Sequence, residues 1–120
     1  MKVSLKSIAD KGVLDSERLV LNVVQDTDLG EYVILRTSYV DSKLKVEPSH
    51  AFWFPDKPAK AGDLVVIYSK TGTYSEKALD NGRTAHFYYW KSSVALWNDV
   101  TWAAVVLYAP TWDAKTVAEL

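Results

Sequence analysis

The side chains best suited to acid–base chemistry or metal binding in this chain are its two histidines, His50 and His86. Each belongs to an aromatic segment typical of a β-strand, and pairing of these two strands would bring the imidazoles together. Two imidazoles beside an aspartate could bind a metal ion or transfer a proton. The chain contains no HExxH motif or similar spacing, however, and a histidine at a strand edge can instead satisfy a backbone carbonyl. The sequence therefore favours a structural role for both histidines and predicts no metal site.

The other residues that could carry chemistry lack the patterns that catalysis or cofactor binding requires. Asp26, Asp28 and Glu31 cluster in one loop and could bind Ca²⁺, but the remaining ligands of a calcium loop are missing, which favours a solvated turn. No serine lies in a GxSxG motif, and neither Gly72 nor Gly82 belongs to a phosphate-binding loop. The absence of cysteine removes disulfides, thiolate nucleophiles and Cys-based zinc sites. We therefore expect no cofactor and no enzymatic activity.

The clearest functional signal is a surplus of aromatic residues, with five tryptophans, seven tyrosines and three phenylalanines. Trp97 and Trp112 lie in or beside expected turns, where the chain's own sheets cover an indole less easily than in mid-strand. Exposed aromatic rings mark protein contacts or sugar-stacking surfaces. The sequence leaves open the alternative that these indoles fill the ends of the fold as core residues. The candidate partner-contact residues are Tyr74, Trp97, Asn98, Asp99 and Trp112.

The overall charge argues against several classes of partner. The formal net charge is −1, and the basic residues are spread along the chain, so we expect no binding to nucleic acid or to an anionic membrane surface. The first residues alternate apolar and polar side chains, unlike a signal peptide, and no segment approaches the roughly 20 apolar residues that span a bilayer. These features predict a cytoplasmic or virion-associated protein.

The length and composition predict one globular domain over residues 1–120. With 48% hydrophobic and 24% charged residues, the chain can bury a core without disulfide or metal cross-links. Because it begins with Met1 and is small, we expect a complete small subunit. Chain ends are usually mobile unless they are tied down, and we expect both ends of this chain to dock onto something.

Residues 50–68 predict the centre of this domain. Phe52, Trp53 and Phe54 suit a pleated surface, and the continuous apolar run at 64–68 is typical of a strand covered on both faces. Pro55 and Pro58 cannot donate to a ladder and end the first strand. We expect these two strands to form a hairpin on which the remaining strands are arranged.

The rest of the chain predicts further short strands and no amphipathic helix. One of these is residues 3–8, which needs a one-residue slip in its alternation. Two long loops are expected, at 41–49 and 69–83. The pattern is typical of an all-β sandwich or barrel. About eight strands are expected in total, at residues 3–8, 17–24, 31–39, 50–54, 64–68, 84–90, 94–99 and 102–109, of which 94–99 is a short strand or a turn.

Several segments together carry a resemblance to a known family. The more specific ones are Gly62-Asp63 before a strand and the late Trp97-Asn98 pair. With the segments 17–21, 28–32, 50–56, 64–72 and 86–90, they are similar to lamin-tail domains, in the small stand-alone form found in bacteria and phages. The resemblance covers residues 17–98 and implies an immunoglobulin-like β-sandwich that serves as a binding or structural module without a catalytic centre. Residues 110–120 have no counterpart in it.

Two functions of different classes follow as hypotheses. The first is a non-enzymatic structural or protein-interaction module, for example a phage capsid decoration subunit that stabilises joints between shell subunits, with a homo-oligomer as one form. The second is a carbohydrate-binding module that uses Trp97, Trp112 and Tyr74 as stacking faces. A titration of tryptophan fluorescence with a panel of glycans distinguishes them, because only the second predicts a shift.

Overall fold

The computed structural model describes residues 1–120 and is all-β, as predicted. It contains eleven strands rather than about eight, because several short pairings lie within segments expected to be loops. Three one-turn 3₁₀ helices complete it, at Leu29–Glu31 (η1), Asp80–Gly82 (η2) and Val117–Glu119 (η3). The strands are β1 (Val3–Ala9), β2 (Arg18–Val23), β3 (Thr27–Asp28), β4 (Tyr32–Val40), β5 (Lys43–Leu44), β6 (His50–Trp53), β7 (Pro58–Ala59), β8 (Leu64–Tyr68), β9 (Ser75–Ala78), β10 (Thr84–Tyr89) and β11 (Trp102–Tyr108).

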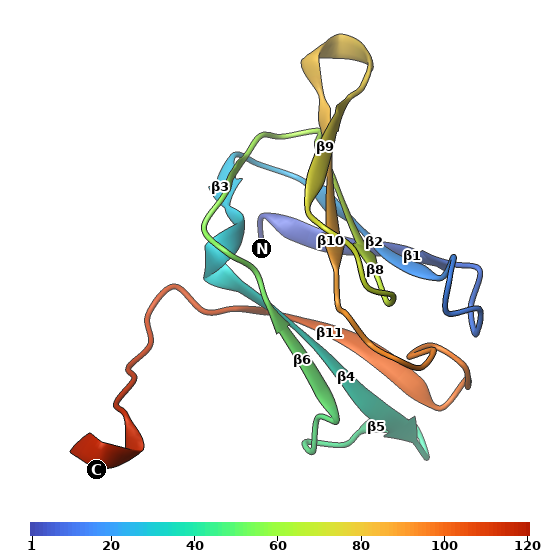
Figure 1. Ribbon diagram of the computed structural model, residues 1–120, viewed down its shortest axis with the longest axis vertical. Helices are drawn as coiled ribbons and strands as arrows, with labels where there is room; N and C mark the ends of the chain where they lie inside the picture. The colour runs from blue at the N-terminus through green and yellow to red at the C-terminus, as the bar shows by residue number, and fades with distance from the viewer.

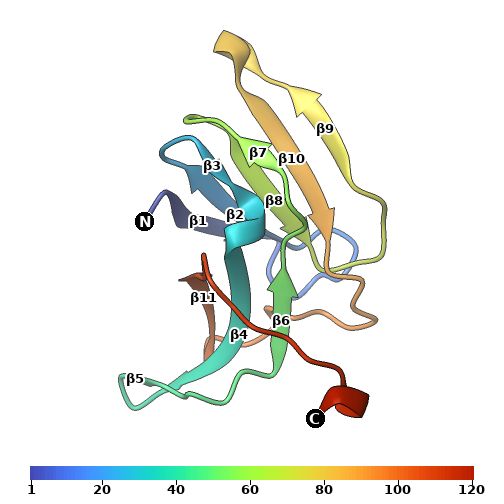
Figure 2. The same ribbon diagram turned by 90° about the vertical axis from the view of Figure 1, so that its left-hand side faces the viewer.

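Two main sheets pack against each other as a sandwich (Figures 1 and 2). The first sheet has the order β1-β2-β8-β10-β9, and all its pairs are antiparallel except β8 with β10. In the second sheet, β4 pairs with β11 along one edge and with β6 and β5 along the other. A two-stranded ribbon of β3 and β7 joins the ends of the sheets. This arrangement is compatible with an immunoglobulin-like domain.

The core forms where the alternating apolar residues of both sheets meet. Leu19, Leu21 and Val23 of β2 are all buried on one face, as the alternation predicts. In β8, Val65, Val66 and Ile67 are all buried, which confirms a strand covered on both sides. The predicted slip in the first strand is also present as a register shift between Leu5 and Ser7. The patterns of period two therefore position the core correctly.

The expected hairpin of residues 50–68 is wrong. β6 pairs with β4 in the second sheet, whereas β8 lies between β2 and β10 in the first. Pro55 and Pro58 lack the N–H groups that a hairpin ladder needs. The intervening chain instead runs along β3, where the Asp28 carboxylate accepts the Lys57 N–H at 2.9 Å and Leu29 donates to the Lys57 carbonyl. This stretch connects the two sheets and does not belong to one of them.

The loops and the chain ends also differ from expectation. The segment 41–49 contains β5, and 69–83 contains β9 and η2, which form with β10 a hairpin that projects beyond the sandwich (Figure 1). Residues 94–99 contain no strand. The N-terminus docks as β1. Residues 110–120 are all exposed, and apart from the contact of Trp112 with Trp53 they lead away from the body, so the last residues do not dock onto the rest of the chain. None of the helices is long and apolar enough to cross a membrane.

Candidate functional site

The segment that carries three of the predicted contact residues is fixed by a buried carboxylate. Glu17, which is fully buried directly before β2, accepts the N–H groups of Leu96 at 2.6 Å and Trp97 at 3.3 Å. It also accepts the Gly12 N–H at 2.9 Å and the Ser69 hydroxyl. A single carboxylate therefore joins the start of β2 to the neighbouring Gly12 turn and to two distant parts of the chain, at Ser69 and at Leu96 and Trp97.

A buried guanidinium holds the same segment from the opposite side. Arg36 of β4 donates to the Leu96 carbonyl at 2.7 Å and to the Ser49 hydroxyl, and its guanidinium lies 3.5 Å from the centre of the Trp102 ring. Burial, partly offset by the charge of Glu17, lowers the pKa of Arg36 from its ordinary value. The N–H group of Leu96 thus donates to the Glu17 carboxylate, and its carbonyl accepts from the Arg36 guanidinium.

The hydrogen bonds of Glu17 and Arg36 hold this segment against the core, and the prediction that Trp97 is exposed is wrong. Its side chain is only 4% exposed and packs in the core with Trp90, so it is not an exposed stacking face. Asn98 accepts a hydrogen bond from the Trp102 indole, and Asp99 accepts the N–H and hydroxyl of Thr101, which lower the pKa of Asp99. Both therefore stabilise the turn before β11. They line a surface hollow of about 390 Å³.

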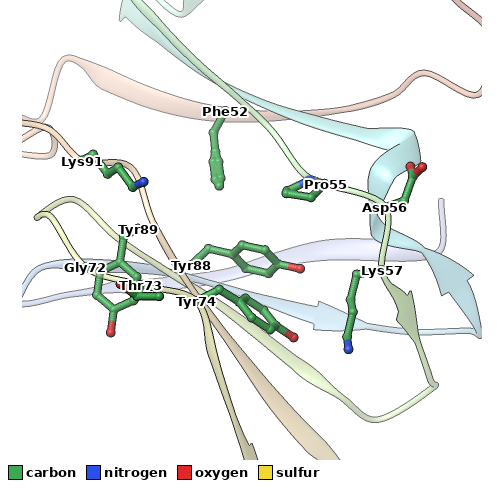
Figure 3. Close-up of a pocket in the computed structure, with 10 residues that line it drawn as sticks. All are labelled: Phe52, Pro55, Asp56, Lys57, Gly72, Thr73, Tyr74, Tyr88, Tyr89 and Lys91. Carbon is green, nitrogen blue, oxygen red and sulfur yellow. The ribbon is translucent and has the colours of Figure 1, made fainter.

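Tyr74, by contrast, borders a surface cavity of about 430 Å³ (Figure 3). Phe52 and Pro55 lie on one side of it and Tyr74 and Tyr88 on the other. The centre of the Tyr74 ring lies 4.8 Å from the centre of the Tyr88 ring. The cavity is completed by Asp56, Lys57, Gly72, Thr73, Tyr89 and Lys91.

A hydrogen-bonded chain leads from this cavity into the core. The Tyr74 hydroxyl lies 3.0 Å from Nδ1 of His86, and Nε2 of His86 lies 2.9 Å from the Asp63 carboxylate. Burial raises the pKa of Tyr74 above its ordinary value and raises that of Tyr88 to about 12, so both phenols are neutral at pH 7 and can donate. Together these groups form a polar network that runs from the cavity to the buried Asp63 carboxylate.

The two histidines do not approach each other, because their strands lie in different sheets. His50 contacts the Ser49 hydroxyl at 3.1 Å and the edge of the Trp90 ring. Burial and the nearby charge of Arg36 lower the pKa of His50. No group of three or more His, Asp or Glu side chains is arranged to hold a metal ion. In the expected acidic loop, Asp26 and Asp28 accept the backbone N–H groups of Ala61, Gly30 and Lys57.

The Asp63–His86 pair gives a pH-dependent contribution to stability. Burial alone would raise the pKa of Asp63, but hydrogen bonds from His86 and from the N–H groups of Lys60 and Thr84 outweigh it, and the pKa is lowered. A carboxyl whose pKa is lower in the folded state stabilises the fold at neutral pH. This stabilisation is lost as the pH falls from about 4, the unfolded value, through the folded pKa.

We expect Asp63→Asn to lower the free energy of unfolding at pH 7 by about 2 kcal/mol, since it removes hydrogen bonds to a charged acceptor. The difference from the wild type should shrink as the pH falls below about 4, where the wild-type carboxylate becomes protonated. Urea unfolding from pH 7 to pH 2.5 measures it. Parallel curves for the two proteins would contradict this role of Asp63.

A second candidate site is the outer face of the β11-β4-β6 sheet. The register places Val33 beside Leu107 and Trp53, and it places Leu35 beside Val105 and Ala51. The alternate row, which includes Ile34 and Phe52, packs into the core. Because residues directly opposite each other point to the same side, the two outer rows are apolar across all three strands.

Both ends of this outer face are bordered by additional apolar side chains. At one end the segment 41–49 folds over Thr37 and leaves a groove of about 250 Å³ next to Leu107 and the 94% exposed Val46. At the other end, Trp112 lies edge-on against Trp53, with ring centres 4.8 Å apart. Trp112 remains 64% exposed and Trp53 48% exposed. We call the two outer rows, the groove and Trp112 the outer apolar face.

The structure therefore separates the five predicted contact residues. Trp97, Asn98 and Asp99 lie together at the turn before β11, Tyr74 borders the cavity, and Trp112 lies on the outer apolar face. No protein-family model matches this chain, and a search of curated proteins finds no match.

Sequence analysis missed both Glu17 and the outer apolar face. A signal for the face was present, since β4 and β11 carry apolar residues at consecutive positions. Apolar side chains on both faces of a strand are normally buried on both faces. In β11, an edge strand, one face is left partly uncovered, and Leu107 is 42% exposed.

Proposed function

We propose that this protein is a non-enzymatic structural or protein-interaction module that binds a protein partner through the outer apolar face. The observation that carries the proposal is the continuity of half-buried and exposed apolar side chains across β11, β4 and β6, from the groove at Leu107 to Trp112. Contiguous apolar surface of this kind is uncommon on proteins that act alone. A rigid sheet also presents it without the entropic cost of ordering a loop.

A finer proposal is that the module is lamin-tail-like and decorates a phage capsid. It is supported by the similarity of residues 17–98 to that family and by the sandwich arrangement. A flat apolar sheet suits a lattice, where each copy adds buried area at a joint between shell subunits. On this proposal the protein sediments with assembled shells from its native source, in a fixed ratio to the shell subunit.

The docking surface can be tested by placing charge on it. The double variant Leu107→Lys with Val46→Lys should weaken binding to the partner purified from the native source by about tenfold or more, since two charges would be desolvated in an apolar contact. Both positions are exposed, so the fold should persist. A calorimetric titration of each variant with the purified partner measures the dissociation constant.

The matched control is Leu5→Lys with Val24→Lys. Leu5 is 41% exposed, close to the 42% of Leu107, but lies on β1 in the other sheet. This control should bind as the wild type does. Equal binding by the wild type and both variants would show that the partner uses another surface.

The carbohydrate-binding alternative has less support. It uses Trp97, Trp112 and Tyr74 as stacking faces, whereas Trp97 is buried and the other two lie in separate environments. A saturable shift of tryptophan fluorescence with a glycan, combined with unchanged protein binding by the charged variants, would favour this alternative.

A further inference from the structure

The free edge of β11 presents unpaired backbone groups in a regular array. The carbonyl of Thr101 accepts from Tyr39 of β4, and the N–H of Ala109 donates to the Glu31 carbonyl. Successive residues of a strand point their N–H and C=O groups to opposite sides. The odd-numbered residues between Thr101 and Ala109 therefore point these backbone groups towards β4. Ala104, Val106 and Tyr108 therefore direct N–H and C=O groups away from the sheet, and β11 pairs with no strand on that side.

The other sheet edges carry features that discourage pairing between chains. β1 contains a register shift and Lys6, and β9 has four residues, of which Glu76 and Lys77 are charged. β6 is equally short, with four residues, and β5 has only two residues. Short strands, charges, prolines and bulges are the usual protection of edges.

β11 has none of this protection. Its seven residues, Trp102–Tyr108, include no charge and no proline, and its register with β4 is unbroken. A strand of this kind on a stable monomer would be exposed to aggregation. The edge is therefore best explained as an interface.

We propose that β11 pairs antiparallel with β11 of a second copy of this chain, about a two-fold axis at Val105. Such a pairing joins the two second sheets into one continuous sheet across the dimer. It satisfies the outward groups of Ala104 and Val106, which face Val106 and Ala104 of the other copy. The hydrogen bonds of this pairing lie at the edge of the sheet and not on the outer apolar face, but the Val105 side chains at the axis belong to that face.

The side chains of β11 fit this partner. With the axis at Val105, Ala103 lies opposite Leu107, Ala104 opposite Val106, and Trp102 opposite Tyr108 of the other copy. Small residues thus face larger ones and aromatic rings face each other, which favours cross-strand packing. The two Val105 side chains meet at a pair without hydrogen bonds, where strands bring side chains closest. An unrelated strand would have no reason to match this sequence of sizes.

The position of the axis gives a charge-swap test. Val105→Lys and Val105→Glu each place two like charges opposite one another, so each variant alone should raise the dimer dissociation constant by about 100-fold or more. An equimolar mixture of the two should form dimers again, because Lys and Glu then face each other. Sedimentation equilibrium of the wild type, each variant and the mixture measures this, with circular dichroism to confirm that each variant is folded.

Each outcome decides the proposal. A dimeric wild type, monomeric single variants and a dimeric mixture support it. A wild type that is monomeric at every concentration, or a dimer that neither variant weakens, overturns it. A mixture that stays monomeric overturns the two-fold axis at Val105 and with it the proposed register of the two strands.

Discussion

Replacement of Glu17 by alanine is expected to lower the free energy of unfolding by about 3–5 kcal/mol, because it leaves buried donors without an acceptor. The N–H groups of Gly12, Leu96 and Trp97 and the Ser69 hydroxyl all donate to this carboxylate. A domain of this size has a total stability of about 5–15 kcal/mol, so the loss removes a large part of it. Urea unfolding followed by tryptophan fluorescence measures the change.

Two further variants make the result interpretable. Glu17→Gln keeps the shape and one acceptor oxygen, and it should lower the free energy of unfolding by about 1–3 kcal/mol. This variant provides the measurement if Glu17→Ala does not fold. Glu47→Ala, at an exposed position in the segment 41–49, is the control and should change stability by less than about 0.5 kcal/mol. A Glu17→Gln protein as stable as the Glu47→Ala control would show that the four donors find other acceptors.

Replacement of Arg36 by methionine is expected to cost about 3 kcal/mol. It removes the charged hydrogen bond to the Leu96 carbonyl and the contact of the guanidinium with the Trp102 ring. Arg36→Lys should recover only part of this loss, because an ammonium cannot bond Leu96 and Ser49 while lying flat on an indole. Equal stability of the lysine variant and the wild type would contradict a role for the guanidinium plane.

The pairing of Glu17 with Arg36 can be measured directly by a double-mutant cycle. Both residues hold Leu96, one at its N–H and one at its carbonyl, so their effects should not add. We expect a coupling of about 1 kcal/mol between Glu17→Gln and Arg36→Met, within the range for residues of one network. The same cycle with Glu47→Ala in place of Glu17→Gln is expected to show no coupling.

The local elements of this fold could be predicted from the sequence, but their assembly could not. The alternation of Leu19, Leu21 and Val23 determines which face of β2 is buried, whatever the strand pairs with. The partner of β6 is a different matter, since Phe52 can pack equally well in a hairpin or between two sheets. Only the ladder of β6 with β4 resolves it, and that ladder is not encoded within residues 50–68.

The site residues were missed for a related reason. Glu17 follows Asp15 and Ser16 and has the local pattern of a polar turn, and its partners at 96 and 97 lie about eighty positions later. Trp97 looks exposed beside Asn98 and Asp99 until the carboxylate that draws its backbone inwards is known. For β11, composition alone shows two apolar sides but cannot say which one the chain itself covers.

The Glu17 carboxylate has a consequence for the lifetime of the folded protein. Its bonds to Ser69, Leu96 and Trp97 span 52, 79 and 80 positions, so they can form only after the two layers have come together. Interactions made late in folding act mainly on the rate of escape from the native state rather than on the rate of reaching it. The carboxylate should therefore slow unfolding of the native state. Slow unfolding limits the access of proteases to a chain that has no covalent cross-link.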